Sequence, residues 1–93
     1  MFNKIHSDEI MYKVARTVTK TNKENVEVRC EYLYKGNLSS CRNYMAKKAI
    51  KTWKEGKKKP SWCAHFLVKG KDSITVRVDR TYNKYTTTTF EIV

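Results

Sequence analysis

The sequence lacks several features that mark large classes of protein. It has no apolar run of the roughly 18 residues that a membrane-spanning helix needs, so we expect no membrane segment. Its first nine residues are too polar for a secretory signal, which predicts a cytoplasmic protein. The 93 residues are too few for two cores, and their 40% hydrophobic content is enough for one. We therefore expect a single folded domain over residues 1–93.

Cysteine and histidine are too few, and too widely spaced, for the common disulfide and metal frameworks. Cys30, Cys41 and Cys63 are an odd number without a close pair, which indicates reduced thiols. A structural zinc site usually combines four ligands in short paired spacings, and here only Cys63 and His65 are near neighbours. The sequence predicts no metal site and no cofactor.

Acidic residues are scarce in the middle of the chain, where basic residues are abundant. The net charge is +11, and residues 35–71 contain eleven Lys or Arg residues against Glu55 alone. The segments before and after this one are close to neutral. Because concentrated positive charge builds a field that attracts a polyanion, the distribution predicts a nucleic-acid-binding surface between Lys35 and Lys71.

Arginine is also scarce, with five residues against fifteen lysines. Lysine suits non-specific contact with phosphates, whereas bidentate reading of bases favours arginine. No helix-turn-helix, zinc-finger or basic-zipper pattern is present, so we favour RNA as the ligand and keep DNA as an alternative. The plentiful Lys, Asn and Thr are typical of AT-rich genomes, as in many bacteriophages.

Hydrophobic spacing predicts two helices in the first 55 residues, with a strand between them. Ser7 can cap a helix over residues 8–20, whose apolar residues recur at helical spacing. Residues 25–35 alternate as a strand with one buried face, on which we place Val26, Val28, Cys30, Tyr32 and Tyr34. Ser39 or Ser40 can cap a second helix that runs to about Glu55, where Gly56 ends it.

The rest of the chain predicts three strands. They cover residues 62–69, 74–79 and 85–93, and there is room for a short further strand at residues 2–5. The expected order is α-β-α-β-β-β. This order predicts an α+β two-layer domain, with two amphipathic helices on a mostly antiparallel sheet of about four strands.

The second predicted helix carries the strongest candidate site. Lys47, Lys51 and Lys54 lie at i, i+4 and i+7, so their ammonium groups form one stripe that can follow a phosphate backbone. A solvated helix face usually mixes charges of both signs, but this one offers only Glu55. The predicted binding residues are Lys35, Arg42, Tyr44, Lys47, Lys48, Lys51, Lys54, Lys57, Lys58, Lys59, Lys69 and Lys71. A secondary set on the first predicted helix comprises Lys13, Arg16 and Lys20.

Aromatic side chains can add base stacking to such a surface. Tyr44 is the best placed, because it lies among lysines on the polar side of its helix. Tyr34, Trp62, Tyr82 and Tyr85 are further candidates, whereas Trp53 and Phe66 fall on faces that we assign to the core.

An enzymatic alternative would use His65 as a base, with Arg42, Arg77 or Arg80 stabilising a phosphorane. The size, basicity and three-stranded C-terminal end resemble the RelE-type messenger-RNA-cleaving toxins. That resemblance implies a small endoribonuclease. The chain departs from the family by placing a strand at residues 26–34, where the family has a helical pair, and it has no local motif of the family.

The sequence therefore favours a small non-enzymatic RNA-binding protein, without catalytic residues, whose lysine-rich helix and loop contact the phosphate backbone. Its composition also fits a phage-encoded inhibitor of a host defence factor or nuclease. Two alternatives remain. One is the toxin-like endoribonuclease, and the other is an inhibitor whose basic patch docks on an acidic protein partner.

Overall fold

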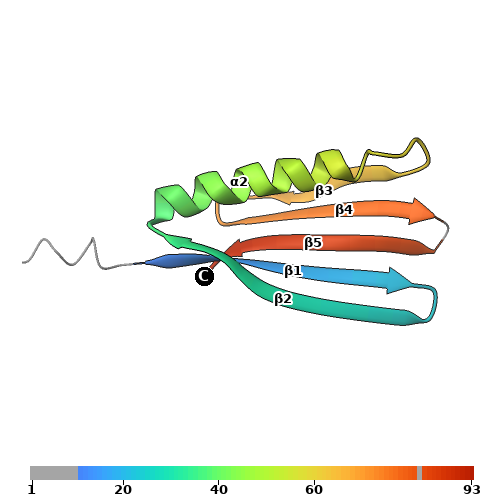
Figure 1. The fold of residues 1–93 in the computed structure, drawn as a ribbon, viewed down its shortest axis with the longest axis horizontal. Helices are drawn as coiled ribbons and strands as arrows, with labels where there is room; N and C mark the ends of the chain where they lie inside the picture. The colour runs from blue at the N-terminus through green and yellow to red at the C-terminus, as the bar shows by residue number, and fades with distance from the viewer. Residues whose placement is uncertain (1–10, 82) are drawn as a thin grey trace, which may run out of the picture.

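The computed structural model describes residues 11–81 and 83–93 of the chain (Figure 1). Its elements are β1 (Tyr12–Asn22), β2 (Asn25–Gly36), α2 (Leu38–Glu55), β3 (Cys63–Lys69), β4 (Ser73–Thr81) and β5 (Lys84–Ile92). The strands form one antiparallel sheet in the order β2-β1-β5-β4-β3. The last strand of the chain therefore lies at the centre of the sheet, and β2 and β3 are its two edges.

The predicted helix over residues 8–20 is wrong, because the part of it that the structure describes belongs to strand β1. Four β-branched residues between Thr17 and Thr21 favour a strand, and β1 pairs with β2 on one side and β5 on the other. Val14 and Ala15 are both buried although they point to opposite faces of the strand, and this pair of adjacent apolar residues contributed to the helical spacing of the sequence. The predicted cap at Ser7 and the short strand at residues 2–5 lie outside the described residues.

The prediction of two helices on about four strands is therefore corrected to one helix on five strands within the described chain. The class remains α+β, and the predicted positions of the other elements are close to those observed. The N-cap of α2 is Asn37, two residues before Ser39 and three before Ser40, and its side chain accepts a hydrogen bond from the Ser40 backbone N–H at 2.8 Å. The helix ends at Gly56 as expected. No helix in the described residues is long and apolar enough to cross a membrane.

The core lies between α2 and one face of the sheet. Its buried residues are Val14, Cys41, Met45, Ala49, Val76, Val78 and Phe90. At the end of the helix, Gly56 is buried so closely against β4 that an added Cβ would lie 2.5 Å from a methyl group of Val78. Trp53 packs beside this core as predicted, stacked on Phe66 with its indole N–H donated to the Ala64 carbonyl at 3.1 Å.

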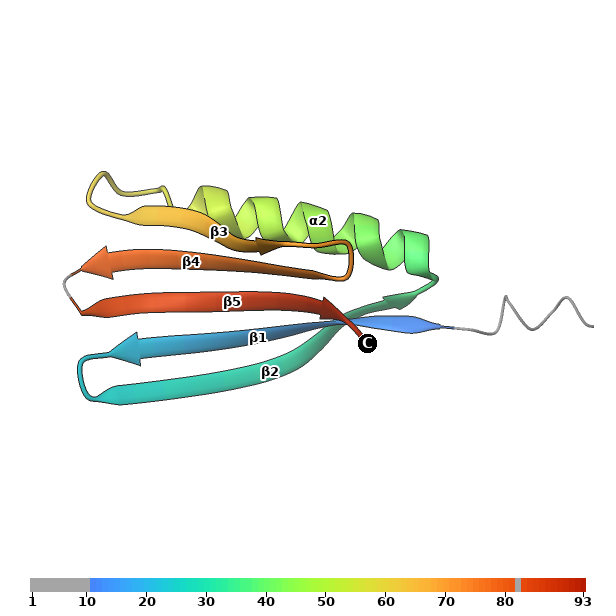
Figure 2. The same ribbon diagram turned by 180° about the vertical axis from the view of Figure 1, so that it is seen from behind.

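The opposite face of the sheet has no helix over it in the described part of the chain (Figure 2). Its centre is a set of threonines that lie side by side on β1, β5 and β4, because register partners in antiparallel strands share a face. They are Thr17, Thr19, Thr21, Thr75, Thr87 and Thr89. The prediction that Val26, Val28, Cys30 and Tyr32 are buried is wrong, since these residues lie at the open edge of this face, with Val28 62% exposed.

Candidate nucleic-acid interface

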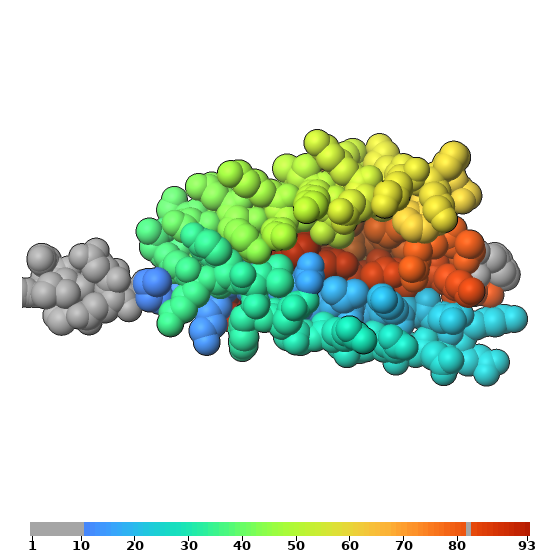
Figure 3. Space-filling model, in the orientation of Figure 1, coloured from blue at the N-terminus to red at the C-terminus, as the bar shows by residue number. Residues whose placement is uncertain are grey.

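The predicted lysine stripe lies on the side of α2 that points away from the sheet. Lys47, Lys51 and Lys54 are exposed, because Cys41, Met45 and Ala49 turn the opposite side of the helix into the core. Lys58 joins them from the loop that follows, and the four lysines surround Ile50 in a shallow depression of about 470 Å³. We call Lys47, Lys51, Lys54 and Lys58 the lysine stripe. Figure 3 shows the helix as a ridge along one border of the molecule.

The positive charge of the lysine stripe is not neutralised within the described residues. The four ion pairs there are Arg16–Glu31, Arg42–Asp72, His65–Asp79 and Arg77–Asp79, and none of them includes a lysine. Glu55 is the only acid that lines the depression. Like charges repel along a helix, so the stripe lowers the stability of α2, and it produces a positive field at this surface.

Other predicted lysines lie above aromatic rings. The ammonium group of Lys57 is 4.2 Å from the centre of the Trp53 ring, and that of Lys48 is 5.6 Å from the Tyr44 ring. Lys59 and Lys69 lie at 5.4 Å and 4.9 Å from Trp62 and Phe66. These cation–π contacts hold the charges close to the protein surface, where they extend the positive field on both sides of the helix.

Tyr44 is less available for base stacking than its helical position suggests. Its ring stacks on Tyr34 of β2, with the ring centres 4.5 Å apart and an angle of 12° between the planes. One face of the ring is therefore already covered. The hydrophobic spacing of the sequence did not reveal this contact, because it joins two elements whose packing depends on the whole sheet.

The remaining predicted residues lie apart from the lysine stripe. Arg42 is paired with Asp72 at 3.0 Å near the start of α2, at the same end of the helix as Lys69 and Lys71. Lys35 is opposite Lys13 at the far ends of β2 and β1. The structure thus separates the predicted basic surface into the lysine stripe and a group of charges at the N-terminal end of the helix.

The secondary set does not form a stripe, because a strand turns alternate residues to opposite faces. Lys13 lies on the face without the helix, with its ammonium group 4.8 Å from the ring of Tyr32. Arg16 lies on the helix side and pairs with Glu31. Lys20 is also on the helix side, farther along β1.

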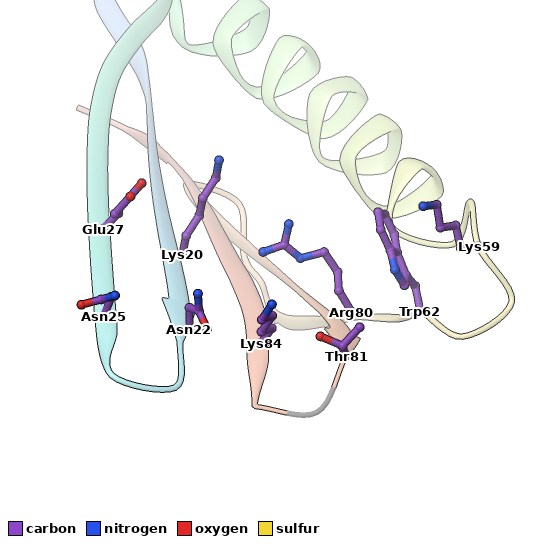
Figure 4. Close-up of a pocket in the computed structure, with 9 residues that line it drawn as sticks. All are labelled: Lys20, Asn22, Asn25, Glu27, Lys59, Trp62, Arg80, Thr81 and Lys84. Atoms are coloured by element: carbon purple, nitrogen blue, oxygen red, sulfur yellow. The ribbon is translucent and has the colours of Figure 1, made fainter.

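Lys20 lines a second hollow that the sequence did not indicate, which we call the end cavity (Figure 4). It has a volume of about 560 Å³ and lies between the β1–β2 hairpin and the loop that follows α2. Arg80, Lys84 and Trp62 line it as well. These residues come from four separate segments, and residues 72–93 have no net charge, so no local pattern could have grouped them.

Of the residues of the enzymatic alternative, Arg80 lines the end cavity, whereas His65 and Arg77 lie elsewhere. Nε2 of His65 is 3.4 Å from Oδ2 of Asp79, and the other carboxylate oxygen, Oδ1, accepts hydrogen bonds from Nε and Nη2 of Arg77. Arg77 packs over Tyr85 at 3.8 Å. This cluster is on the face of the sheet without the helix, so a strand bound to the lysine stripe would be on the other side of the sheet from His65.

Among the described residues, no group of three or more His, Cys, Asp or Glu side chains is arranged to hold a metal ion. Comparison of the chain with protein-family models, with curated proteins and with solved structures found no match in any of the three. The functional argument therefore depends on the geometry and charge of the chain itself.

Proposed function

We propose that this protein binds nucleic acid through the phosphate backbone, with single-stranded RNA as its preferred ligand. The observation that carries the proposal is the lysine stripe, four exposed lysines on one surface without an ion pair in the described part of the chain. Binding a polyanion there would release the counterions that both molecules hold, which favours association most at low salt.

The dimensions of the stripe suit a phosphate backbone. At 1.5 Å per residue, Lys47 and Lys54 are separated by about 10 Å along the helix axis. That length corresponds to about three nucleotides of one strand in a duplex, at 3.4 Å each. The stripe is therefore long enough for its lysines to contact several phosphates of one strand.

The preference for a single strand follows from what surrounds the stripe. Lysine supplies point charges and few groups for reading base edges in a groove, so sequence-specific duplex recognition is not favoured. An aromatic ring at the end cavity supplies a platform for an unstacked base, which only a single strand presents readily.

The test is a binding series with labelled single-stranded RNA, duplex RNA and duplex DNA at several salt concentrations. The variant Lys47→Gln/Lys51→Gln/Lys54→Gln should weaken binding and reduce the salt slope by about two units on a single strand, at roughly 0.7 for each lost contact. The matched control is Lys13→Gln/Lys23→Gln/Lys35→Gln, which removes the same charge from other parts of the surface. The control should retain most of the slope.

Three outcomes would overturn the proposal. Equal losses of affinity and salt slope in the two variants would show that net charge, and not the stripe, attracts the ligand. Absence of binding tighter than about 10⁻⁴ M near physiological salt would be weaker than ordinary non-specific binding and would favour an acidic protein partner. Cleavage of the RNA, abolished by His65→Ala, would favour the endoribonuclease.

A further inference from the structure

The end cavity combines an aromatic wall with a cationic centre, which is the chemistry that recognises a nucleotide. We propose that it binds one nucleotide of a single strand, with the base stacked on Trp62 and the phosphate held by Lys20, Arg80 and Lys84. This inference rests on the proposed function, because it gives the strand that follows the lysine stripe a defined place to end or turn.

Trp62 packs against the edge of the core and is partly exposed where it lines the cavity. Its ring is half-buried at the rim of the cavity, and the Lys59 ammonium group lies 5.4 Å from the ring centre (Figure 4). The other tryptophan is different, since Trp53 stacks on Phe66 and donates its indole N–H to a backbone carbonyl. A base bound at the rim would stack on Trp62 as Phe66 stacks on Trp53.

The cations in the cavity lack protein partners in the described chain. Lys20, Arg80 and Lys84 take part in none of its ion pairs. Figure 4 shows Arg80 reaching from β4 toward the middle of the cavity, with Lys20 on β1. Guanidinium and ammonium groups without a carboxylate partner can form charge-assisted hydrogen bonds with a phosphate.

Among the described residues, Glu27 is the only acid that lines the cavity, and it lies on β2, at the border away from Trp62 (Figure 4). Asn22 and Asn25 lie near it at the hairpin end. These groups provide acceptors and donors for the polar edge of a base or for ribose hydroxyls. The cavity therefore offers three kinds of contact that a nucleotide needs: a stacking surface, cations for the phosphate, and neutral or acidic groups for the polar edges.

Size and position agree with this ligand. The volume of about 560 Å³ falls within the range of roughly 300–1,000 Å³ of small-molecule sites. Lys58 belongs to the lysine stripe and Lys59 lines the end cavity, so the two sites are joined by consecutive residues. A single strand can pass from one to the other without leaving the positive surface.

The experiment is a titration of the ¹⁵N-labelled protein with AMP, followed through its two tryptophan indole N–H signals. The Trp62 signal, identified from its loss in Trp62→Leu, should shift, while the Trp53 signal stays in place. Ribose 5-phosphate should bind about tenfold more weakly than AMP, because it lacks the base that stacks. Arg80→Gln/Lys84→Gln should weaken AMP binding at least as much, and it keeps the inference testable if Trp62→Leu unfolds.

The matched control is Lys47→Gln/Lys51→Gln, which removes the same charge from the lysine stripe and should leave AMP binding unchanged. Equal affinity for AMP and ribose 5-phosphate would overturn the nucleotide site and leave a site for phosphate alone. If the two double variants weaken AMP binding equally, the net charge of the protein and not the end cavity accounts for the binding. If AMP fails to bind while the RNA salt series still depends on Lys47, Lys51 and Lys54, the inference fails and the proposed function stands.

Discussion

The two faces of the sheet differ in chemistry although they are built from alternate residues of the same strands. On the helix side, the strands carry the buried Val14, Val76 and Phe90, and then the cations of the end cavity. On the other side they carry threonines, bordered by the exposed Val26 and Val28. Most of the excess charge that the sequence concentrates in residues 35–71 lies in the fold on α2 and the loop after it, on the helix side of the sheet.

On the helix side, the apolar residues that stabilise the fold and the basic residues lie in different places. The middle of the helix side is apolar and holds α2, whereas its margins are basic and available to a ligand. On the face without the helix, His65 and Arg77 pair with Asp79, and the threonines are uncharged. Three changes test this contrast, from the largest expected effect to the smallest.

The largest difference is expected between two aromatic residues of β5 that point to opposite faces. Phe90→Ala removes a fully buried side chain from the helix side and should lower the free energy of unfolding by about 3–5 kcal/mol. Tyr85→Ala removes a ring that packs under Arg77 on the other side, and we expect a loss of about 1–2 kcal/mol. Denaturant unfolding of both variants measures the contrast. Equal losses would mean that a partner or a second copy covers the threonine face.

A smaller loss in the free energy of unfolding is expected at Gly56, where the end of the helix packs closely against the sheet. Gly56→Ala places a methyl group 2.5 Å from Cγ2 of Val78 and should cost about 1–3 kcal/mol through overpacking. Val78→Ala removes the obstructing methyl group. In the double variant, the combined loss should therefore be smaller than the sum of the two single losses. Additive losses in thermal or denaturant unfolding would show that the end of α2 can shift away from β4 without cost.

The smallest effect concerns binding. Glu55→Gln removes the only acid beside the lysine stripe and should tighten RNA binding about two- to fivefold, which corresponds to roughly 0.5–1 kcal/mol for one surface charge. Glu91→Gln makes the same change in net charge on the face without the helix, and it should alter the affinity less. If the two variants tighten binding equally in the salt series, the binding surface is not confined to the helix side.

Most of the chain after residue 24 follows rules that a sequence reveals. The alternation of residues 25–35 predicted β2, and the spacing of Cys41, Met45 and Ala49 predicted which side of α2 is buried. The lysine stripe was predictable for the same reason, since helical spacing within one element places Lys47, Lys51 and Lys54 together. Local periodicity was sufficient to predict a feature when all its residues belonged to one helix or strand.

The rest depends on contacts between distant segments. Residues 12–22 become a strand because β2 and β5 supply partners for both of its edges, and β5 comes more than 60 residues later in the chain. The exposure of Val28 could not be foreseen, because it depends on which strand is an edge and which face the helix covers. The end cavity could not be predicted for the same reason, since Lys20, Trp62 and Arg80 come together only after the whole sheet has formed.

Because β5 lies at the centre of the sheet, the sheet can be completed only after β5 has been synthesised. Val14 pairs with Ile92, so the hairpin of β1 and β2 cannot join the sheet until β5 has been synthesised and has left the ribosome. Contacts so distant in sequence form slowly, because the intervening loop must close first. Until then β1 also has an unpaired edge, in addition to the edge of β2 that stays open in the folded sheet, and unpaired edges can associate with other chains. Pairing with β5 is therefore the step that protects β1 from such association.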